Sequence, residues 1–241
     1  MKNVFKSLFL VAFIFSLQGL AASWSKDDFS DINGKDKPLN VLIIGANGSV
    51  AREVTQGFLS GTSAKLKLFL RNSSRLQNVK NANASRVELI NGDATNKEAL
   101  KRAMQGVDVV YANLNGDLPT MAKAIIEAMD ETKLKRLVWI SSFGVYEKEI
   151  SQQEFSKIAA YNPPHRAAVK LIEASDLDYT IIRAQWFSSA NEIDYELTQK
   201  GEPFKNENAY ISRKSIAHLV IKLCYESSNL RQSLGINKPA K

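Results

Sequence analysis

The stretch LNVLIIGANGSVAREVTQGFL, Leu39 to Leu59, constrains the fold more than any other part of the sequence. It opens with an apolar run, continues with the small residues Gly45, Gly48 and Ala51, and then shows helical apolar spacing. A buried strand, a tight turn and a helix in this order form a phosphate-binding unit, because the helix N-terminus points its free N–H groups at the turn. Gly45 allows the turn, and Gly48 lets the backbone approach a diphosphate. Similar small residues also occur in purely structural turns, but the flanking strand and helix favour nucleotide binding.

Strand and helix patterns alternate along the rest of the chain, which has 241 residues and can therefore bury a full core. Apolar strands are expected at 66–70, 87–90, 107–111, 135–142, 177–183 and 233–237. Helices are expected at 97–104, 118–130, 165–174, 191–201 and from residue 212 on, with a polar loop at 147–162. This alternation predicts a single α/β domain with a doubly wound parallel sheet, the Rossmann fold, and right-handed crossovers.

The first 38 residues are expected to lie outside this domain. Residues 1–22 combine two lysines, a short apolar run and a small-residue cleavage site, which is the pattern of a secretory signal peptide. The run is short for a membrane span, so none is expected after signal removal. Residues 23–38 are polar and predict a flexible linker before a nucleotide-binding Rossmann domain at 39–241. The protein is therefore expected to be exported, to the periplasm or the medium, and cytoplasmic if the signal does not function.

Charge and composition indicate which classes of ligand the protein is expected to bind. The formal charge is +7, but the basic residues are scattered, so a small-molecule substrate is expected and nucleic acid is not. The one cysteine, Cys224, lies in an apolar helical pattern without metal-ligand spacing, and no metal site is predicted. These features leave the oligomeric state open.

The end of the second strand predicts which dinucleotide is bound. An acid at this position binds the ribose 2′-hydroxyl of NAD, whereas a basic residue accommodates the 2′-phosphate of NADP. Arg71 occupies the position, and Arg75 follows one turn later. Because a guanidinium pairs well with phosphate, NADP is expected; the alternatives are NAD, or two arginines that are merely solvated.

Polar residues at three other strand ends are candidates for the same crevice. Asp93 follows the third strand, where an acid can meet adenine and can also cap the next helix. Ala112 and Asn113 begin the segment expected to pass over the middle of the cofactor. Ser142 and Tyr146 follow the fifth strand and are candidate catalytic or substrate-binding residues; a serine-rich loop that caps backbone groups is the alternative.

Four segments, GANGSVA, NGDATN, WISSFGVY and LDYTIIRAQWF, together resemble one known family. They look like the atypical short-chain dehydrogenase/reductases, and more narrowly the NmrA-like, NAD(P)H-binding branch of single-domain proteins. The resemblance covers Leu39 to Pro239. It implies that the dinucleotide is bound by Gly45, Asn47, Gly48, Ser49, Val50, Arg71, Asp93, Ala94, Ala112 and Asn113. It also implies that Ser142 is the active-site serine.

One departure from that family concerns the proton donor. The wider superfamily uses a tyrosine that passes a proton as the hydride moves. A lysine four residues later lowers the pKa of that tyrosine and holds the ribose. Here Tyr161 is followed by His165, and the two prolines between them argue against a shared helical face. Tyr146 or His165 could replace the dyad, or His165 could be a surface residue at a helix start. Gln185 also replaces the proline that usually ends the strand-six motif, which would reshape the substrate wall.

Two functions follow from these residues. In the first, the protein is an NADP-dependent oxidoreductase whose substrate lies between Ser142, Tyr146, Trp186 and Phe187. In the second, which the missing dyad motivates, it binds NADP(H) and acts as a sensor or regulatory module without turnover. The fold alone does not choose between them.

Overall fold

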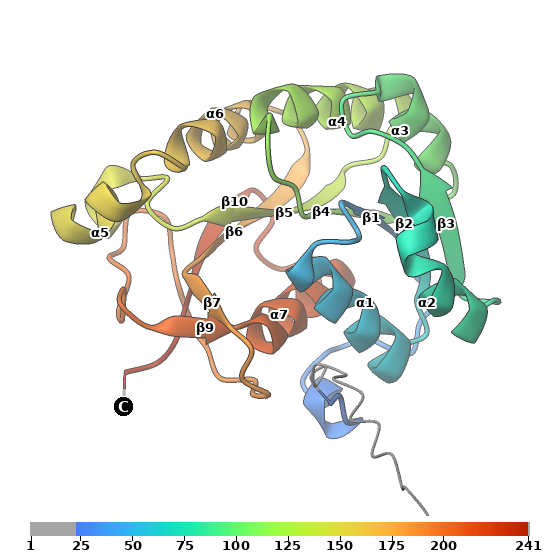
Figure 1. Cartoon of the computed structure of the whole chain (residues 1–241), viewed down its shortest axis with the longest axis horizontal. Coiled ribbons are helices and arrows are strands. Elements are labelled where there is room, and N and C mark those ends of the chain that lie inside the picture. Colours follow the sequence, from blue (N-terminus) through green and yellow to red (C-terminus); the bar gives the residue numbers. More distant parts are fainter. Residues whose placement is uncertain (1–22, 241) are drawn as a thin grey trace, which may run out of the picture.

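The sheet of the computed structural model, which describes residues 23–240, has eight strands in the order β3-β2-β1-β4-β5-β6-β10-β8 (Figure 1). The strands are β1 (Asn40–Ile44), β2 (Lys65–Leu70), β3 (Val87–Asn91), β4 (Val109–Ala112), β5 (Arg136–Ser142), β6 (Asp178–Ala184), β8 (Glu196–Thr198) and β10 (Gln232–Asn237). Neighbouring strands are parallel except β8, which runs antiparallel to β10. The order reverses between β1 and β4, where such a sheet leaves a crevice at its carboxyl edge. The predicted doubly wound α/β fold is confirmed.

Helices cover both faces of this sheet (Figure 1). One face carries α1 (Ser49–Gly61) and α7 (Arg213–Tyr225); the other carries α3 (Lys97–Ala103), α4 (Leu118–Thr132) and α6 (Asn162–Glu173). The remaining elements are α2 (Gln77–Ala82), α5 (Gln152–Ile158), the 3₁₀ turns η1 (Asp27–Phe29), η2 (Ser73–Leu76) and η3 (Glu147–Glu149), and a parallel pair formed by β7 (Trp186–Ser188) and β9 (Tyr210–Ser212).

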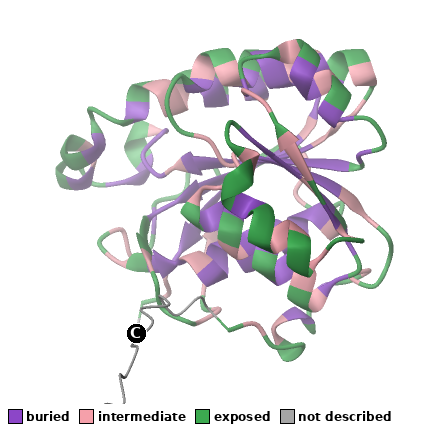
Figure 2. Ribbon diagram, turned by 45° about the vertical axis from the view of Figure 1, so that its right-hand side comes forward, coloured by how far each residue is buried: buried purple, intermediate pink, exposed green. Residues whose placement is uncertain are grey.

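Side chains of β1 show why its apolar run forms a central strand. Val41 and Ile43 pack into the core under α1 and α7, and Leu42 and Ile44 pack into the core under α3, α4 and α6. All four are fully buried, as expected for a parallel strand that is covered on both faces. Figure 2 shows the same layering, with buried residues in the sheet and on the inner faces of the helices.

Two segments differ from the expected elements. Residues 191–201 form no helix; they contain β8, whose register against β10 places Leu197 opposite Ile236. Residues 147–162 are not a loop, since they contain η3 and α5. Ser151 caps α5 by accepting a hydrogen bond from the backbone N–H of Glu154, and Ile158 packs beside Phe143. Because the segment is mostly polar, its few apolar positions did not predict a helix.

Residues 23–38 are also not the flexible linker that their polarity predicts. Phe29 is fully buried against Gly61 of α1, and its ring stacks on Trp24 at a centroid distance of 5.0 Å. Lys214 and Lys222 of α7 form ion pairs with two aspartates of the segment, each at 2.9 Å. A few anchors therefore dock a polar segment onto the domain. The predicted signal peptide, residues 1–22, lies outside the described residues, and export stays a prediction; none of the described helices has the length and apolar character needed to cross a membrane.

Candidate functional site

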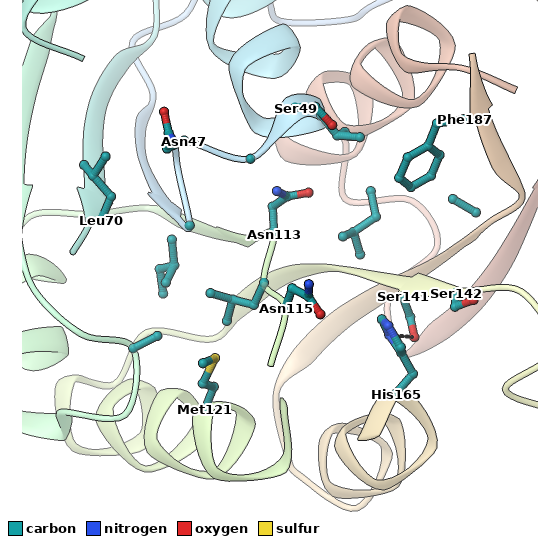
Figure 3. Close-up of a pocket in the computed structure, with 18 of the residues that line it drawn as sticks. Asn47, Ser49, Leu70, Asn113, Asn115, Met121, Ser141, Ser142, His165 and Phe187 are labelled. Atoms are coloured by element: carbon teal, nitrogen blue, oxygen red, sulfur yellow. Dashed lines mark hydrogen bonds between the residues drawn. The ribbon is translucent and has the colours of Figure 1, made fainter. Parts of the chain in front are cut away.

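A cavity of about 850 Å³ opens at the carboxyl edge of the parallel strands. It is lined by the ends of β1, β2, β4, β5 and β6, by the N-terminus of α1 and by the start of α6 (Figure 3). Residues from distant parts of the sequence meet here because parallel strands end at one edge of the sheet. The cavity thus joins the predicted phosphate-binding turn to the predicted catalytic loop.

The turn between β1 and α1 packs tightly against the loop that follows β4. Gly45 has a φ of +79°, and a Cβ at this position would lie 2.1 Å from the carbonyl oxygen of Asn113. A Cβ on Gly48 would lie 2.1 Å from the side-chain nitrogen of Asn113. Tyr111 donates a hydrogen bond of 3.3 Å to the other end of that amide. Both glycines are therefore required for the shape of the turn.

The N-terminus of α1 opens into the cavity and provides the donors of an anion site. Gly48 is the N-cap residue, and within the described part of the chain no side chain accepts a capping hydrogen bond there. Ser49 begins the helix and, with Asn47 and Val50, lines the cavity. Uncapped N–H groups and the positive end of the helix dipole favour a bound anion.

Arg71 and Arg75 line the cavity beyond the end of β2, together with Asp93 and Ala94. Hydrogen bonds from the backbone N–H and the hydroxyl of Thr95 lower the pKa of Asp93, and the nearby Arg71 charge lowers it further. Asp93 does not cap α3, because Asn96 fills that role by accepting from the backbone N–H of Ala99. Asp93 instead shapes the turn at the mouth of the cavity.

The opposite end of the cavity carries Ser141, Ser142 and His165 (Figure 3). The hydroxyl of Ser141 lies 3.3 Å from Nδ1 of His165, whereas Ser142 donates to the carbonyl oxygen of Phe143 at 3.1 Å. Partial burial lowers the pKa of His165 and so favours the neutral form of its ring. A neutral imidazole beside a hydroxyl can give or take a proton, depending on its tautomer.

Tyr161 and His165 line the same cavity, although the two prolines between them argue against a shared helical face. The helix α6 begins at Asn162, so both prolines fall in its first turn, where a missing N–H costs no helical hydrogen bond. Tyr161 is the N-cap residue, and 70% of its surface is exposed. The start of α6 therefore brings both residues to the cavity.

Tyr146 and Ala112 are not brought into the cavity. Tyr146 donates its hydroxyl to Glu173 of α6, and its ring packs under the ammonium group of Lys200 at 4.6 Å. Burial, followed by the hydrogen bond to Glu173, raises the pKa of the Tyr146 phenol. Ala112 is buried within β4, and its neighbour Asn113 supplies the cavity wall instead. Of the predicted proton donors, only His165 faces the site.

An aromatic wall closes the side of the cavity beside β6. Trp186 and Phe187 line it while 38% and 39% of their respective surfaces stay exposed. Gln185, which replaces the family's proline, is buried; its amide nitrogen donates to the carbonyl oxygen of Asn206, and its amide oxygen accepts from the backbone N–H of Lys238 at 3.0 Å. The glutamine thus ties this wall to the C-terminal segment.

Sequence reasoning missed several residues of the cavity. Ser141 faces His165, although its neighbour Ser142 was the predicted serine. The two adjacent serines give no local signal that distinguishes them. Met121 of α4 and Ile158 of α5 also line the cavity and were not predicted as site residues. Both belong to helices, which the strand-end rule does not cover.

Comparison with known proteins identifies the family. A family model described as NAD(P)H-binding matches residues 45–227, most of the chain. The chain belongs to this NAD(P)H-binding family. A Rossmann-fold NAD(P)-binding family protein from Shigella flexneri has 37% sequence identity and a TM-score of 0.68, with 84% of this chain and 95% of that chain covered.

Two other proteins are similar to this chain. A short-chain dehydrogenase/reductase from Veillonella parvula, solved in complex with NADP, has the same fold at 23% identity and a TM-score of 0.77, covering 84% of this chain and 95% of its own. The uncharacterized sugar epimerase YhfK of Bacillus subtilis is 27% identical over 212 residues, which cover 83% of this chain and 94% of that protein. The family match begins at Gly45 and so places the turn before α1 in the NAD(P)H-binding domain.

The partial burial of His165 predicts a pH dependence of stability. Its folded-state pKa lies below the unfolded value of about 6.5, so the unfolded chain binds the extra proton first. This contribution is complete above pH 6.5 and is lost as the pH falls. We expect the melting temperature to fall between pH 7.5 and pH 5.5, and to fall less in His165→Gln. An equal fall in both proteins would contradict this. Burial also lowers the pKa of His218, so His218→Gln is expected to reduce the fall as well, and the double variant to reduce it further.

Proposed function

We propose that the protein is an NADP-dependent oxidoreductase that acts on a small carbonyl or quinone substrate. One observation carries this proposal: a single cavity runs from the uncapped N-terminus of α1 and two arginines to a Ser141–His165 pair. The first end suits a phosphorylated dinucleotide, and the second suits proton transfer. An aromatic wall next to the second end suits a flat substrate.

We call the turn from Gly45 to Gly48, together with the N-terminus of α1, the phosphate cradle. Its residues fit the cofactor that the family implies. Gly45 and Gly48 leave no Cβ over the turn, and the first N–H groups of α1 would hold the diphosphate. Arg71 and Arg75 would hold a 2′-phosphate, which favours NADP over NAD. The relative from Veillonella parvula, which was solved with NADP, supports the same choice. When bound, the cofactor supplies or accepts a hydride at its nicotinamide ring.

The chain's own residues would orient the substrate and carry its proton. With Nδ1 protonated, His165 donates to Ser141, and the Ser141 hydroxyl can then donate to a substrate oxygen. Ser142 can do the same if its bond to Phe143 is exchanged for the substrate. Tyr161 lies at the open side of the same helix start and can cover the substrate from solvent. Trp186 and Phe187 provide the apolar face.

The role of the arginines is tested by cofactor selectivity. Arg71→Ala is expected to weaken NADPH binding about tenfold, because a charge-assisted bond to phosphate is lost, and to leave NADH binding unchanged. Isothermal titration of both cofactors measures this directly. Arg52→Ala, which removes an exposed charge on α1, is the control for net charge. Equal weakening of NADPH and NADH would count against the NADP assignment.

A second candidate function is a non-catalytic NADP(H)-binding module, and the histidine at the lysine position favours it. Partial burial lowers the pKa of His165 and favours its neutral form, so the ring does not supply the fixed positive charge that a lysine holds beside a tyrosine. NADPH oxidation against a panel of carbonyls and quinones separates the two functions. Turnover that falls in Ser141→Ala supports the enzyme; tight NADPH binding without turnover of any substrate supports the module.

A further inference from the structure

Arg213, at the start of α7, bridges the two halves of the site. Its Nε donates to the hydroxyl of Ser49 at 3.1 Å, across 164 residues of sequence. Its Nη1 donates to the carbonyl oxygen of Ser188 at 2.9 Å and to the hydroxyl of Ser189 at 3.2 Å. Its guanidinium carbon lies 5.5 Å from the ring centroid of Phe187. One side chain therefore contacts both the phosphate cradle and the aromatic wall.

The contact between Arg213 and Ser49 places the guanidinium beside the predicted diphosphate site. Ser49 is the first residue of α1, and its N–H is among the groups that would bind a diphosphate. A diphosphate at this place would lie next to the guanidinium and would attract it strongly, since arginine pairs well with phosphate oxygens. Any shift of Arg213 toward the anion would pull on its bonds to Ser188 and Ser189.

The segment Trp186–Ser189, on the other side of Arg213, can move if the guanidinium shifts. The hydroxyl of Ser188 is buried, and within residues 23–240 it has no hydrogen-bond partner. Buried hydroxyls are normally paired, so the present arrangement leaves a cost that a small movement could relieve. Trp186 and Phe187, directly before Ser188, are more than one third exposed despite lining the cavity. The wall can therefore still close over a ligand.

We propose that Arg213 is a positioning residue that couples a diphosphate in the cradle to closure of the Trp186–Ser189 wall over the substrate. This inference rests on the proposed dinucleotide site and adds a regulation of it: the substrate wall forms fully only when the cofactor's diphosphate is in place. The order of binding follows, with cofactor first and substrate second.

The test uses the fluorescence of Trp186 and two ligands that lack the nicotinamide ring. 2′-Phospho-ADP-ribose carries the diphosphate, whereas adenosine 2′,5′-bisphosphate lacks it. Acrylamide quenching is measured with each ligand at saturation, and the signal of Trp186→Phe is subtracted to remove the other tryptophans. In the wild-type protein, we expect 2′-phospho-ADP-ribose to protect Trp186 from quenching and adenosine 2′,5′-bisphosphate to leave it unchanged.

Two variants of Arg213 separate coupling from simple charge. Arg213→Ala is expected to weaken 2′-phospho-ADP-ribose binding about tenfold and to abolish the protection of Trp186 at saturation. Arg213→Lys is expected to keep part of the affinity but not the protection, because an ammonium group cannot bond Ser49 and Ser188 in a fixed fork. Arg52→Ala, on the exposed side of α1, is expected to leave both unchanged.

The outcomes distinguish this inference from the proposed function. Failure of the wild-type protein to bind either ligand or NADPH would overturn the dinucleotide site itself, and the coupling with it. If both Arg213 variants bound 2′-phospho-ADP-ribose as tightly as the wild type and protected Trp186 equally well, the coupling alone would be overturned. Protection of Trp186 by adenosine 2′,5′-bisphosphate would also overturn it, because no diphosphate is then needed.

Discussion

Replacement of Glu149 by alanine is expected to lower the free energy of unfolding by about 3–5 kcal/mol, because it leaves the charge of Arg183 buried without its partner. Both side chains are fully buried, and Arg183 donates to the Glu149 carboxylate. Burial lowers the pKa of Arg183 to about 10, so the guanidinium keeps its charge at neutral pH. A buried, unpaired guanidinium has no water to replace the lost carboxylate.

Further hydrogen bonds extend from this pair toward the site. Arg183 also donates to the hydroxyl and to the carbonyl oxygen of Ser233, each at 3.1 Å, and Glu149 accepts from the backbone N–H of Gly201 at 2.6 Å. The pair thereby joins the end of β6 to β10 and to the loop before Phe204. Since Gln185 and the aromatic wall follow β6 directly, loss of the pair is expected to loosen the wall as well.

Urea denaturation of the wild type, Glu149→Ala and a double variant Glu149→Leu/Arg183→Met measures the effect. The double variant removes both charges and keeps apolar volume, so it is expected to be less destabilised than the single variant. Phe155→Leu, beside the same loop, is a control for a conservative apolar change. A single variant within about 1 kcal/mol of the wild type would contradict the argument.

The sequence predicted the fold well because the strong signals are local. Val41 to Ile44 is a continuous apolar run, and the small residues after it specify one kind of turn. The same reasoning placed Arg71, Asp93 and Asn113 at strand ends, and the structure brings them into one cavity. A strand-end rule needs only the order of strands, which the alternating pattern supplies.

The residues that the sequence did not place depend on contacts between distant segments or on a precise helix start. Tyr161 joined the site because α6 begins at Asn162, a few residues earlier than the expected start at His165. Tyr146 does not line the cavity, because its hydroxyl donates to Glu173 of α6. Arg213 meets Ser49 only through the packing of α7 beside α1. None of these contacts has a signature in local sequence.

Replacement of Gly45 by alanine is expected to weaken NADPH binding on the order of 100-fold, since overpacking of this kind costs about 1–3 kcal/mol and here acts on the cradle itself. The φ of +79° is one that other residues adopt only with strain. The added Cβ would also lie 2.1 Å from the carbonyl oxygen of Asn113, a backbone atom that cannot rotate away. The turn must therefore shift and carry the N–H groups of α1 with it.

Gly106 provides the matched control for this change. Its φ is +69°, but within the described residues a Cβ there would meet no atom within 4 Å. Gly106→Ala therefore adds the backbone strain, about 1 kcal/mol, without the clash. Titration of NADPH into both variants, with denaturation curves for each, separates strain from clash. Equal loss of NADPH affinity in the two variants would show that the close contact with Asn113 does not shape the cradle, and the assignment of this turn as the diphosphate site would fail.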